Sequence, residues 1–188
     1  MDLRGNLAAV GQRGHIETWA DYRADLHAFL ATLHDQHPNT PRFLLGHSMG
    51  GLIVLDYAIH FPNADLRGLL VSSPLLAPPN VPPIMTTLGR LLSRVAPSFS
   101  LAPGADANTL SRDPAAVQDY LDDPLVHQQA TPRFATLMEE TRLFVLDNLD
   151  GVRYPLFLYY GSADDLVPPQ VTRDTFEHLG ADDKTRHE

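Results

Sequence analysis

The chain of 188 residues lacks cysteine altogether. Without cysteine there is no disulfide framework, no thiolate nucleophile and no zinc or iron–sulfur site with cysteine ligands. Long apolar stretches are also missing, because no segment approaches the ~18 residues that a helix needs to cross a bilayer. Residues 1–6 do not resemble a secretory signal, in which a charged segment precedes an apolar one. We therefore expect a soluble protein of the cytoplasm.

Basic residues are scarce as well, with 14 Lys and Arg against 23 Asp and Glu and a formal net charge of -9. Proteins that bind nucleic acids obtain much of their affinity from Lys and Arg that contact phosphates. The charge balance therefore argues against nucleic acid as a partner. The composition is otherwise that of a globular protein, with 44% apolar and 20% charged residues.

Short apolar runs alternate with helical patterns at both ends of the chain. A short apolar run after a turn suits a buried strand, and apolar positions three and four apart indicate a helix. Strand, helix and strand in close succession form a βαβ unit, which implies a mostly parallel sheet, so the fold class is α/β. The predicted strands are 42–45, 67–72 and 155–160, with a further strand beginning at 184, and the predicted helices are 16–37, 51–59 and 169–179.

Between these parts the strand–helix alternation lapses and helical patterns follow one another, at 83–95, 114–121 and 132–149. We therefore interpret residues 74–150 as a helical insertion over the sheet. The predicted domain organisation is an α/β core, formed by residues 1–73 and 151–188, that carries this insertion.

A Gly-x-Ser-x-Gly pattern, GHSMGG at 46–51, lies between a predicted strand and a predicted helix. A nucleophile elbow needs this context, with serine on a sharp turn and small residues two positions before and after it. Ser48 is then the candidate nucleophile. Met49 would direct its backbone N–H at the developing oxyanion, favoured by the positive end of the helix. The alternative is a glycine-rich turn with an incidental serine.

A serine nucleophile needs a histidine base, and that base needs an orienting carboxylate. Asp164 and Asp165 follow the strand predicted at 155–160, at the sheet edge where α/β proteins bind ligands. Either could orient a histidine, and the alternative is a solvated pair of helix-capping acids.

The histidine itself is missing from the pattern. Only His178 and His187 follow Asp164 in the sequence. His178 lies within the helix predicted at 169–179, and His187 is expected at the beginning of the last strand, at the end opposite the site. His47 is expected to pack rather than to act as a base, because adjacent side chains on an elbow diverge.

No metal or organic cofactor is expected. His27, His34 and His37 are close in sequence, but no further His or carboxylate completes a metal site at a known spacing. A solvated helix face is the preferred interpretation of these histidines.

The sequence resembles the monoacylglycerol lipase and lysophospholipase branch of the α/β-hydrolases, close to the serine-aminopeptidase-like hydrolases. The resemblance implies that Ser48 is the nucleophile, Asp164 the acid of the triad and Met49 an oxyanion donor. It also implies that residues 74–150 form a cap over an acyl-binding pocket, which can contact a membrane peripherally. The matching segments are DLRG at 2–5, GQRGHI at 11–16, GHSMGG at 46–51, SSP at 72–74, LSRDP at 110–114, DPLVH at 123–127 and GSAD at 161–164.

Several parts of the family pattern are absent from residues 1–188. Residues 6–10 replace a His-Gly and a Ser of the family, and the strands with the oxyanion loop would precede Met1. The strand and loop that carry the catalytic His would follow Glu188. We therefore expect the middle of a longer protein, with a partial α/β-hydrolase fold: a mostly parallel sheet, helices on both faces and the cap. The strand at 42–45 would then have a free edge, open to self-association.

The expected activity is hydrolysis of a small lipid or ester substrate, such as a monoacylglycerol or a lysophospholipid, through an acyl-enzyme. Because a serine without a base is a poor nucleophile, we expect little or no activity from the 188 residues alone. The alternatives are a catalytically silent fragment or pseudo-hydrolase that binds a ligand, and another esterase or aminopeptidase-like activity on the same fold.

Overall fold

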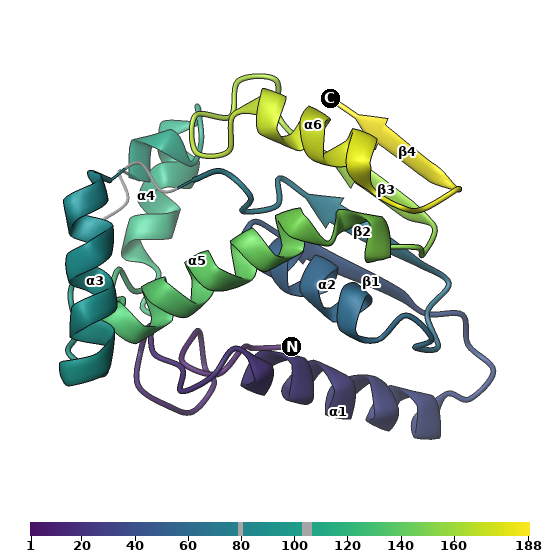
Figure 1. Cartoon of the computed structure of the whole chain (residues 1–188), viewed down its shortest axis with the longest axis horizontal. Helices are drawn as coiled ribbons and strands as arrows, with labels where there is room; N and C mark the ends of the chain where they lie inside the picture. The colour runs from purple at the N-terminus through teal and green to yellow at the C-terminus, as the bar shows by residue number, and fades with distance from the viewer. Residues whose placement is uncertain (79–80, 103–106) are drawn as a thin grey trace. The chain divides into compact units, whose positions relative to one another are not determined.

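A computed structural model describes residues 1–78, 81–102 and 107–188. The chain divides into two compact units: unit 1 comprises Met1–Asp25 and Pro79–Glu139, and unit 2 comprises Leu26–Pro78 and Glu140–Glu188. The helices and strands, labelled in Figure 1, are α1 (Ala20–Gln36), β1 (Phe43–His47), α2 (Met49–His60), β2 (Gly68–Ser72), α3 (Pro83–Val95), α4 (Pro114–Asp122), α5 (Pro132–Asp147), β3 (Leu156–Tyr159), α6 (Pro169–His178) and β4 (Lys184–His187).

Unit 2 contains a four-stranded sheet in the order β1-β2-β3-β4 (Figure 1). All three strand pairs are parallel, so the predicted α/β class is confirmed. The strands are in register, since His47 pairs with Ser72 and Ser72 pairs with Tyr159. Their carboxyl ends therefore form one edge of the sheet. The free edge expected for the first strand is present in the described structure, where β1 is an outer strand.

One face of the sheet is covered by helices, and we call it the covered face. Successive side chains of a strand point to opposite faces, which places Leu69, Val71 and Leu158 on this side. All three are at most 1% exposed. α2 lies here, because a Cβ added to Gly46 would be 2.7 Å from Cγ2 of Val54. α6 lies here too, since the side chain of Lys184 in β4 donates to the Phe176 carbonyl at 2.9 Å.

The opposite face, which we call the open face, carries apolar side chains in contact with solvent. Phe43 is 62% exposed, Leu45 59% and Phe157 38%. Phe43 and Phe157 border a groove of about 690 Å³ at the amino ends of the strands. Helices were expected on both faces, and in the described structure the contacts of α2 and α6 place both helices on the covered face.

Most predicted elements occur within a few residues of their expected positions, and α1 differs most. Its helix begins at Ala20 rather than at 16, and the chain enters it by a turn in which the carbonyls of Thr18 and Trp19 accept the N–H groups of Asp21 and Tyr22. There the Asp21 carboxylate accepts the N–H of Thr18 at 3.1 Å, an arrangement similar to a capping box. The Thr-x-x-Asp spacing is a start signal that the apolar periodicity alone did not reveal.

In unit 1, segments from distant parts of the sequence meet. His127 Nε2 donates to the carbonyl of Gly5 at 3.0 Å. The backbone of Gly14 lies so close to Gln129 that an added Cβ would be 1.9 Å from the Gln129 carbonyl oxygen. Unit 1 therefore contains most of the predicted insertion, together with residues 1–25; the cap boundaries at 74 and 150 stay a prediction. Among the described residues, no helix combines the length and apolar character required to cross a membrane.

Candidate active site

Ser48 occupies the sharp turn between β1 and α2. Its backbone has φ 53 and ψ -118, and it directly precedes Met49, the first residue of the helix. A positive φ is uncommon for a residue other than glycine, and such conformations cluster at active sites. The strand, the strained serine and the helix follow one another as a nucleophile elbow requires.

The glycines around Ser48 differ in how strictly their position requires them. A Cβ on Gly46 would be 2.2 Å from the carbonyl oxygen of Gly50, a distance that no side chain tolerates. A Cβ on Gly51 would be 3.0 Å from Pro74. At Gly50 an added Cβ would meet nothing within 4 Å in the part of the chain that the structure describes. Small residues were expected two positions before and two positions after Ser48. The structure explains the requirement at Gly46, whereas after Ser48 the crowded position is Gly51 rather than Gly50.

Met49 presents its backbone N–H at the start of α2. The first N–H groups of a helix have no acceptor within the helix, and the helix dipole places partial positive charge there. Such an N–H can donate to an oxygen that becomes negative beside Ser48.

Asp164 lies in the loop that follows β3. Its Oδ1 accepts the N–H groups of Leu166 at 3.0 Å and of Val167 at 2.8 Å, and these bonds hold the carboxylate in place. Its Oδ2 has no hydrogen-bond partner among the described residues. β1 and β3 flank β2, so the strands that carry Ser48 and Asp164 are about 10 Å apart. Asp165, the alternative acid, is exposed.

No histidine of the described residues forms a hydrogen bond with Ser48 or Asp164. His178 donates to the Asp174 carbonyl at 2.7 Å within α6 and is exposed. His47 Nδ1 is 3.0 Å from the Ser72 hydroxyl. The structure thus places neither ring as a base for Ser48.

The expected position of His187 is wrong. β4 is only four residues long, and His187 pairs with Tyr159, so it lies at the carboxyl end of the sheet, not at the opposite end. Three strand spacings still separate it from β1, which corresponds to about 14 Å. His187 therefore shares the correct edge with Ser48 but lies beyond the reach of its hydroxyl.

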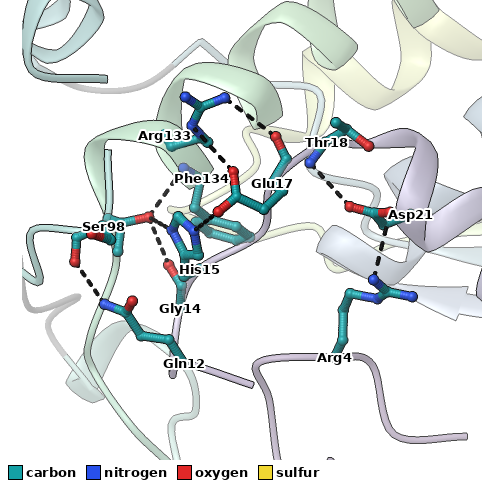
Figure 2. Close-up of polar contacts among 11 residues, drawn as sticks. Arg4, Gln12, Gly14, His15, Glu17, Thr18, Asp21, Ser98, Arg133 and Phe134 are labelled. Carbon is teal, nitrogen blue, oxygen red and sulfur yellow. Dashed lines mark hydrogen bonds and ion pairs between the residues drawn. The ribbon is translucent and has the colours of Figure 1, made fainter. Parts of the chain in front are cut away.

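Unit 1 holds a second cluster of polar side chains (Figure 2). His15 Nδ1 is 2.9 Å from the hydroxyl of Thr131, and its Nε2 is 3.3 Å from the carboxylate of Glu17. This order of hydroxyl, imidazole and carboxylate resembles a catalytic triad. However, Thr131 is 1% exposed and its oxygen accepts the Phe134 N–H at 3.2 Å, which caps α5. The cluster therefore joins the segment around His15 to a helix start, a role that the sequence analysis missed although Thr131-Pro132 is a helix-start signal.

In the described part of the chain, no three His, Asp or Glu side chains form a group that could hold a metal ion. The histidines of α1 have other partners. His27 Nδ1 is 3.1 Å from the Tyr57 hydroxyl and its ring stacks on Phe61, while His34 Nδ1 is 3.1 Å from the Asp65 carboxylate.

The family described as Serine aminopeptidase, S33, matches residues 1–188. The chain belongs to this family. The crystal structure of a monoacylglycerol lipase from Paleococcus ferrophilus superimposes on this chain with a TM-score of 0.89 at 34% identity. That match covers 100% of this chain and 70% of the other, which shows that this chain has a monoglyceride lipase-like α/β-hydrolase fold.

Two relatives similar in sequence carry the names of lipases. Monoacylglycerol lipase of Mycolicibacterium smegmatis is 28% identical over 97% of this chain, and the chain spans 65% of that relative. Phospholipase YtpA of Bacillus subtilis is 24% identical over 100% of the chain, which spans 72% of it. The chain spans less than two thirds of the Mycolicibacterium relative, and the names of both relatives denote enzymes that act on lipid esters.

Proposed function

We propose that Ser48 is the nucleophile of a serine hydrolase that cleaves carboxylic esters of lipids through an acyl-enzyme. The observation that carries the proposal is the backbone of Ser48, which stands at φ 53 between a parallel strand and a helix start. A strained serine at this point of an α/β sheet has its hydroxyl exposed to a substrate at the carboxyl edge.

The proposed reaction has two stages. The Ser48 hydroxyl oxygen attacks the ester carbonyl carbon while its proton passes to a histidine base, and the Met49 N–H donates to the resulting oxyanion. The bond to the leaving alcohol breaks as the alcohol takes the proton from the base. Water then attacks the acyl-enzyme in the same manner, which releases the fatty acid and restores Ser48.

The role of Asp164 in this proposal is to hold the histidine. Two backbone N–H groups already fix its Oδ1, so Oδ2 is the oxygen that faces a base. Because no described histidine bonds to Ser48 or Asp164, we propose that the 188 residues alone are inactive or very weak. A hydroxyl with no base nearby remains neutral and attacks slowly.

The proposed substrates are monoacylglycerols or lysophospholipids. Support comes from the names of the Mycolicibacterium and Paleococcus relatives, and from the phospholipase of Bacillus subtilis. The chain spans only part of each, so acyl length and head group belong to the proposal as well. The alternatives are a silent ligand-binding chain and an aminopeptidase-like or other esterase activity on the same fold.

Labelling with a fluorophosphonate tests the nucleophile. We expect slow labelling that maps to the peptide containing Ser48, disappears in Ser48→Ala and increases when imidazole is added as an external base. Ser162→Ala, in the exposed loop after β3, is the matched control and should label normally. Labelling that persists in Ser48→Ala, or none even with imidazole, would overturn the assignment. An acyl-length series of nitrophenyl esters, with imidazole present, then separates lipid esters from short esters.

The proposed peripheral contact with a membrane rests on α3. Gly89 is half-buried and Ser93 is buried, whereas all large apolar residues of the helix except the half-buried Leu92 face solvent. At 100° per residue these apolar positions form one stripe. The exposed fractions are 76% for Ile84, 45% for Leu88, 57% for Leu91 and 69% for Val95.

The charge of α3 favours an anionic lipid surface. The helix carries Arg90 and Arg94 but no acidic residue, within a chain of net charge -9. An exposed apolar stripe with flanking arginines is typical of a helix that lies in the membrane interface. Location in the cytoplasm at such a surface is part of this proposal.

Co-sedimentation with vesicles of phosphatidylglycerol and phosphatidylcholine tests the membrane contact. We expect binding that Leu88→Asp abolishes and that pure phosphatidylcholine weakens. Leu121→Asp removes an apolar side chain of similar exposure, 50%, from α4 and is the control. Equal losses in the two variants would contradict a specific role for α3.

A further inference from the structure

We infer that Ser73 is a positioning residue for the oxyanion donor, an inference that rests on the proposed roles of Ser48 and Met49. Three described residues other than glycine have a positive φ: Leu7, Ser48 and Ser73. Ser73 stands at φ 36 immediately after β2 and is 9% exposed. Serine rarely adopts this conformation, and it persists only where the surrounding structure demands it.

The conformation of Ser73 reverses the chain as it leaves the sheet. A strand that continued straight would carry residue 75 about 10 Å beyond residue 72. Instead, the residues before and after the turn both form hydrogen bonds with Ser48. The N–H of Ser48 donates to the Ser72 carbonyl at 2.9 Å, and the N–H of Leu75 donates to the Ser48 carbonyl at 3.0 Å. Residues 72–76, which we call the β2 exit loop, thus hold the Ser48 backbone at its N–H and at its carbonyl.

The second of these bonds acts on the oxyanion donor. The carbonyl of Ser48 and the N–H of Met49 belong to one peptide group, which is planar and trans. That carbonyl accepts the N–H of Leu52 at 3.2 Å, within the helix, and the N–H of Leu75 at 3.0 Å, so the bond from the β2 exit loop is the second of two that set its direction. Together the two bonds also set the direction in which the Met49 N–H points, and an oxyanion donor works only when it is aimed at the developing charge.

The β2 exit loop is itself held from several sides. The N–H of Ser73 donates to the Tyr159 carbonyl at 2.9 Å. The side chain of Arg142, on α5, donates to the Leu76 carbonyl at 3.2 Å. Pro74 packs against the helix start, since a Cβ on Gly51 would be 3.0 Å from Pro74. The loop is therefore rigid enough to transmit the turn at Ser73 to the elbow.

The turn depends on the backbone of Ser73 and not on its hydroxyl. Glycine adopts a positive φ without steric cost, so Ser73→Gly should keep the turn. Valine is β-branched and strongly disfavours it, so Ser73→Val should open the turn. The pair separates backbone conformation from side-chain chemistry.

Amide hydrogen exchange on the 188-residue chain tests the inference without any reaction. In the wild type we expect the Ser48 and Leu75 amides to exchange as slowly as amides within the sheet. Ser73→Val should lower the protection of the Leu75 amide by about tenfold or more, whereas Ser73→Gly should keep it. Leu7→Val, at φ 47 in unit 1, makes the same kind of change elsewhere and should leave Leu75 unaffected.

Fluorophosphonate labelling in the presence of imidazole adds the chemical readout. Loss of one oxyanion donor lowers rates by about 10²–10³-fold, so a misdirected donor in Ser73→Val should slow labelling by at least about tenfold. Ser73→Gly should label at the wild-type rate. A purely structural role of Ser73 would change the unfolding midpoint but not the labelling rate of the folded chain.

Each result decides the inference. Fast exchange of Leu75 in the wild type overturns it, and this measurement holds even if Ser73→Val does not fold. An equal loss of Leu75 protection in Ser73→Gly and Ser73→Val overturns it too, because the loop would then depend on the Ser73 hydroxyl. If exchange follows the expected pattern but the wild type does not react with the fluorophosphonate, the role of the β2 exit loop is supported and the proposed function is wrong.

Discussion

The two faces of the sheet have nearly the same apolar character and very different surroundings. On the covered face Leu158 is fully buried, and Leu69 and Val71 are at most 1% exposed. On the open face Phe43 and Leu45 have more than half of their surface in solvent. Parallel sheets are normally covered on both sides, and their strands are apolar throughout for that reason. The apolar composition of these strands therefore suits a sheet that is covered on both faces, whereas the described residues place helices on one face only.

The largest expected difference between the faces comes from adjacent residues of β3. Leu158→Ala leaves a cavity in the covered face and should lower the free energy of unfolding by about 2–5 kcal/mol. Phe157→Ala removes a side chain that is 38% exposed and whose ring stacks on that of Tyr159, with 5.6 Å between the ring centroids. Its free energy of unfolding should fall by only about 1 kcal/mol. Urea unfolding of the two variants measures both. Equal losses would show that the open face is covered in solution.

A pair of glycines provides the next comparison. Gly46→Ala would place a Cβ 2.2 Å from a backbone oxygen on the covered face and should cost about 1–3 kcal/mol, with loss of labelling at Ser48. In Gly68→Ala, on the open face, the added Cβ would be 3.0 Å from the Pro155 carbonyl oxygen and 3.3 Å from the exposed ring of Phe43. The latter change should be milder, below about 1 kcal/mol, by the same measurement. The reverse order would disprove the assignment of the faces.

Self-association is the third comparison, and it concerns the open face and the free edge of β1. Leu45→Asp places a charge on the outer strand, where charges oppose edge pairing and apolar contact. We expect the wild type to sediment with a concentration-dependent mass and Leu45→Asp to remain monomeric. Leu121→Asp, equally polar but located on α4, is the control and should behave as the wild type. A monomeric wild type would rule out association through this surface.

The smallest effect is expected at Glu188, which accepts hydrogen bonds from Arg173 of α6. Hydrogen bonds from Arg173 hold the pKa of the Glu188 carboxyl below its usual 4.5. The stabilisation is present above the unfolded pKa and is lost as the pH falls through the lower folded value. The side chains of Arg173 and Glu188 are 36% and 34% exposed, and the pair is in contact with solvent, so the effect on stability is small and weakens with salt. An NMR titration of Glu188 should show a midpoint below 4.5 that rises in Arg173→Gln and rises less in Arg186→Gln.

Much of the fold could be predicted because its signals are local. The helix at 83–95 coincides with α3, since prolines and periodicity mark its limits within one segment. The strand–serine–helix order around Ser48 could be predicted for the same reason, because the glycine spacing, the apolar run and the helical pattern adjoin one another.

Other features depend on distant partners and left no local signal. A serine in the sequence does not predict a positive φ. The turn at Ser73 follows from hydrogen bonds of the β2 exit loop to Ser48 and Tyr159, which are distant in sequence. The place of His187 depends on the length and register of a strand pair that is remote in sequence. The exposure of Phe43 and Leu45 depends on what covers a face, which a run of apolar residues does not specify.

The contact between His15 and Thr131 has a consequence for the order in which the protein forms. These residues are 116 positions apart, so residues 1–25 cannot complete unit 1 until Thr131 has been synthesised. At about 5–20 residues per second, that delay is roughly 6–23 s on the ribosome. During this time the β1–α2–β2 segment, whose contacts are local, is already complete in sequence. We therefore expect the elbow region to emerge and begin to fold while the first residues of the chain still wait for their partners.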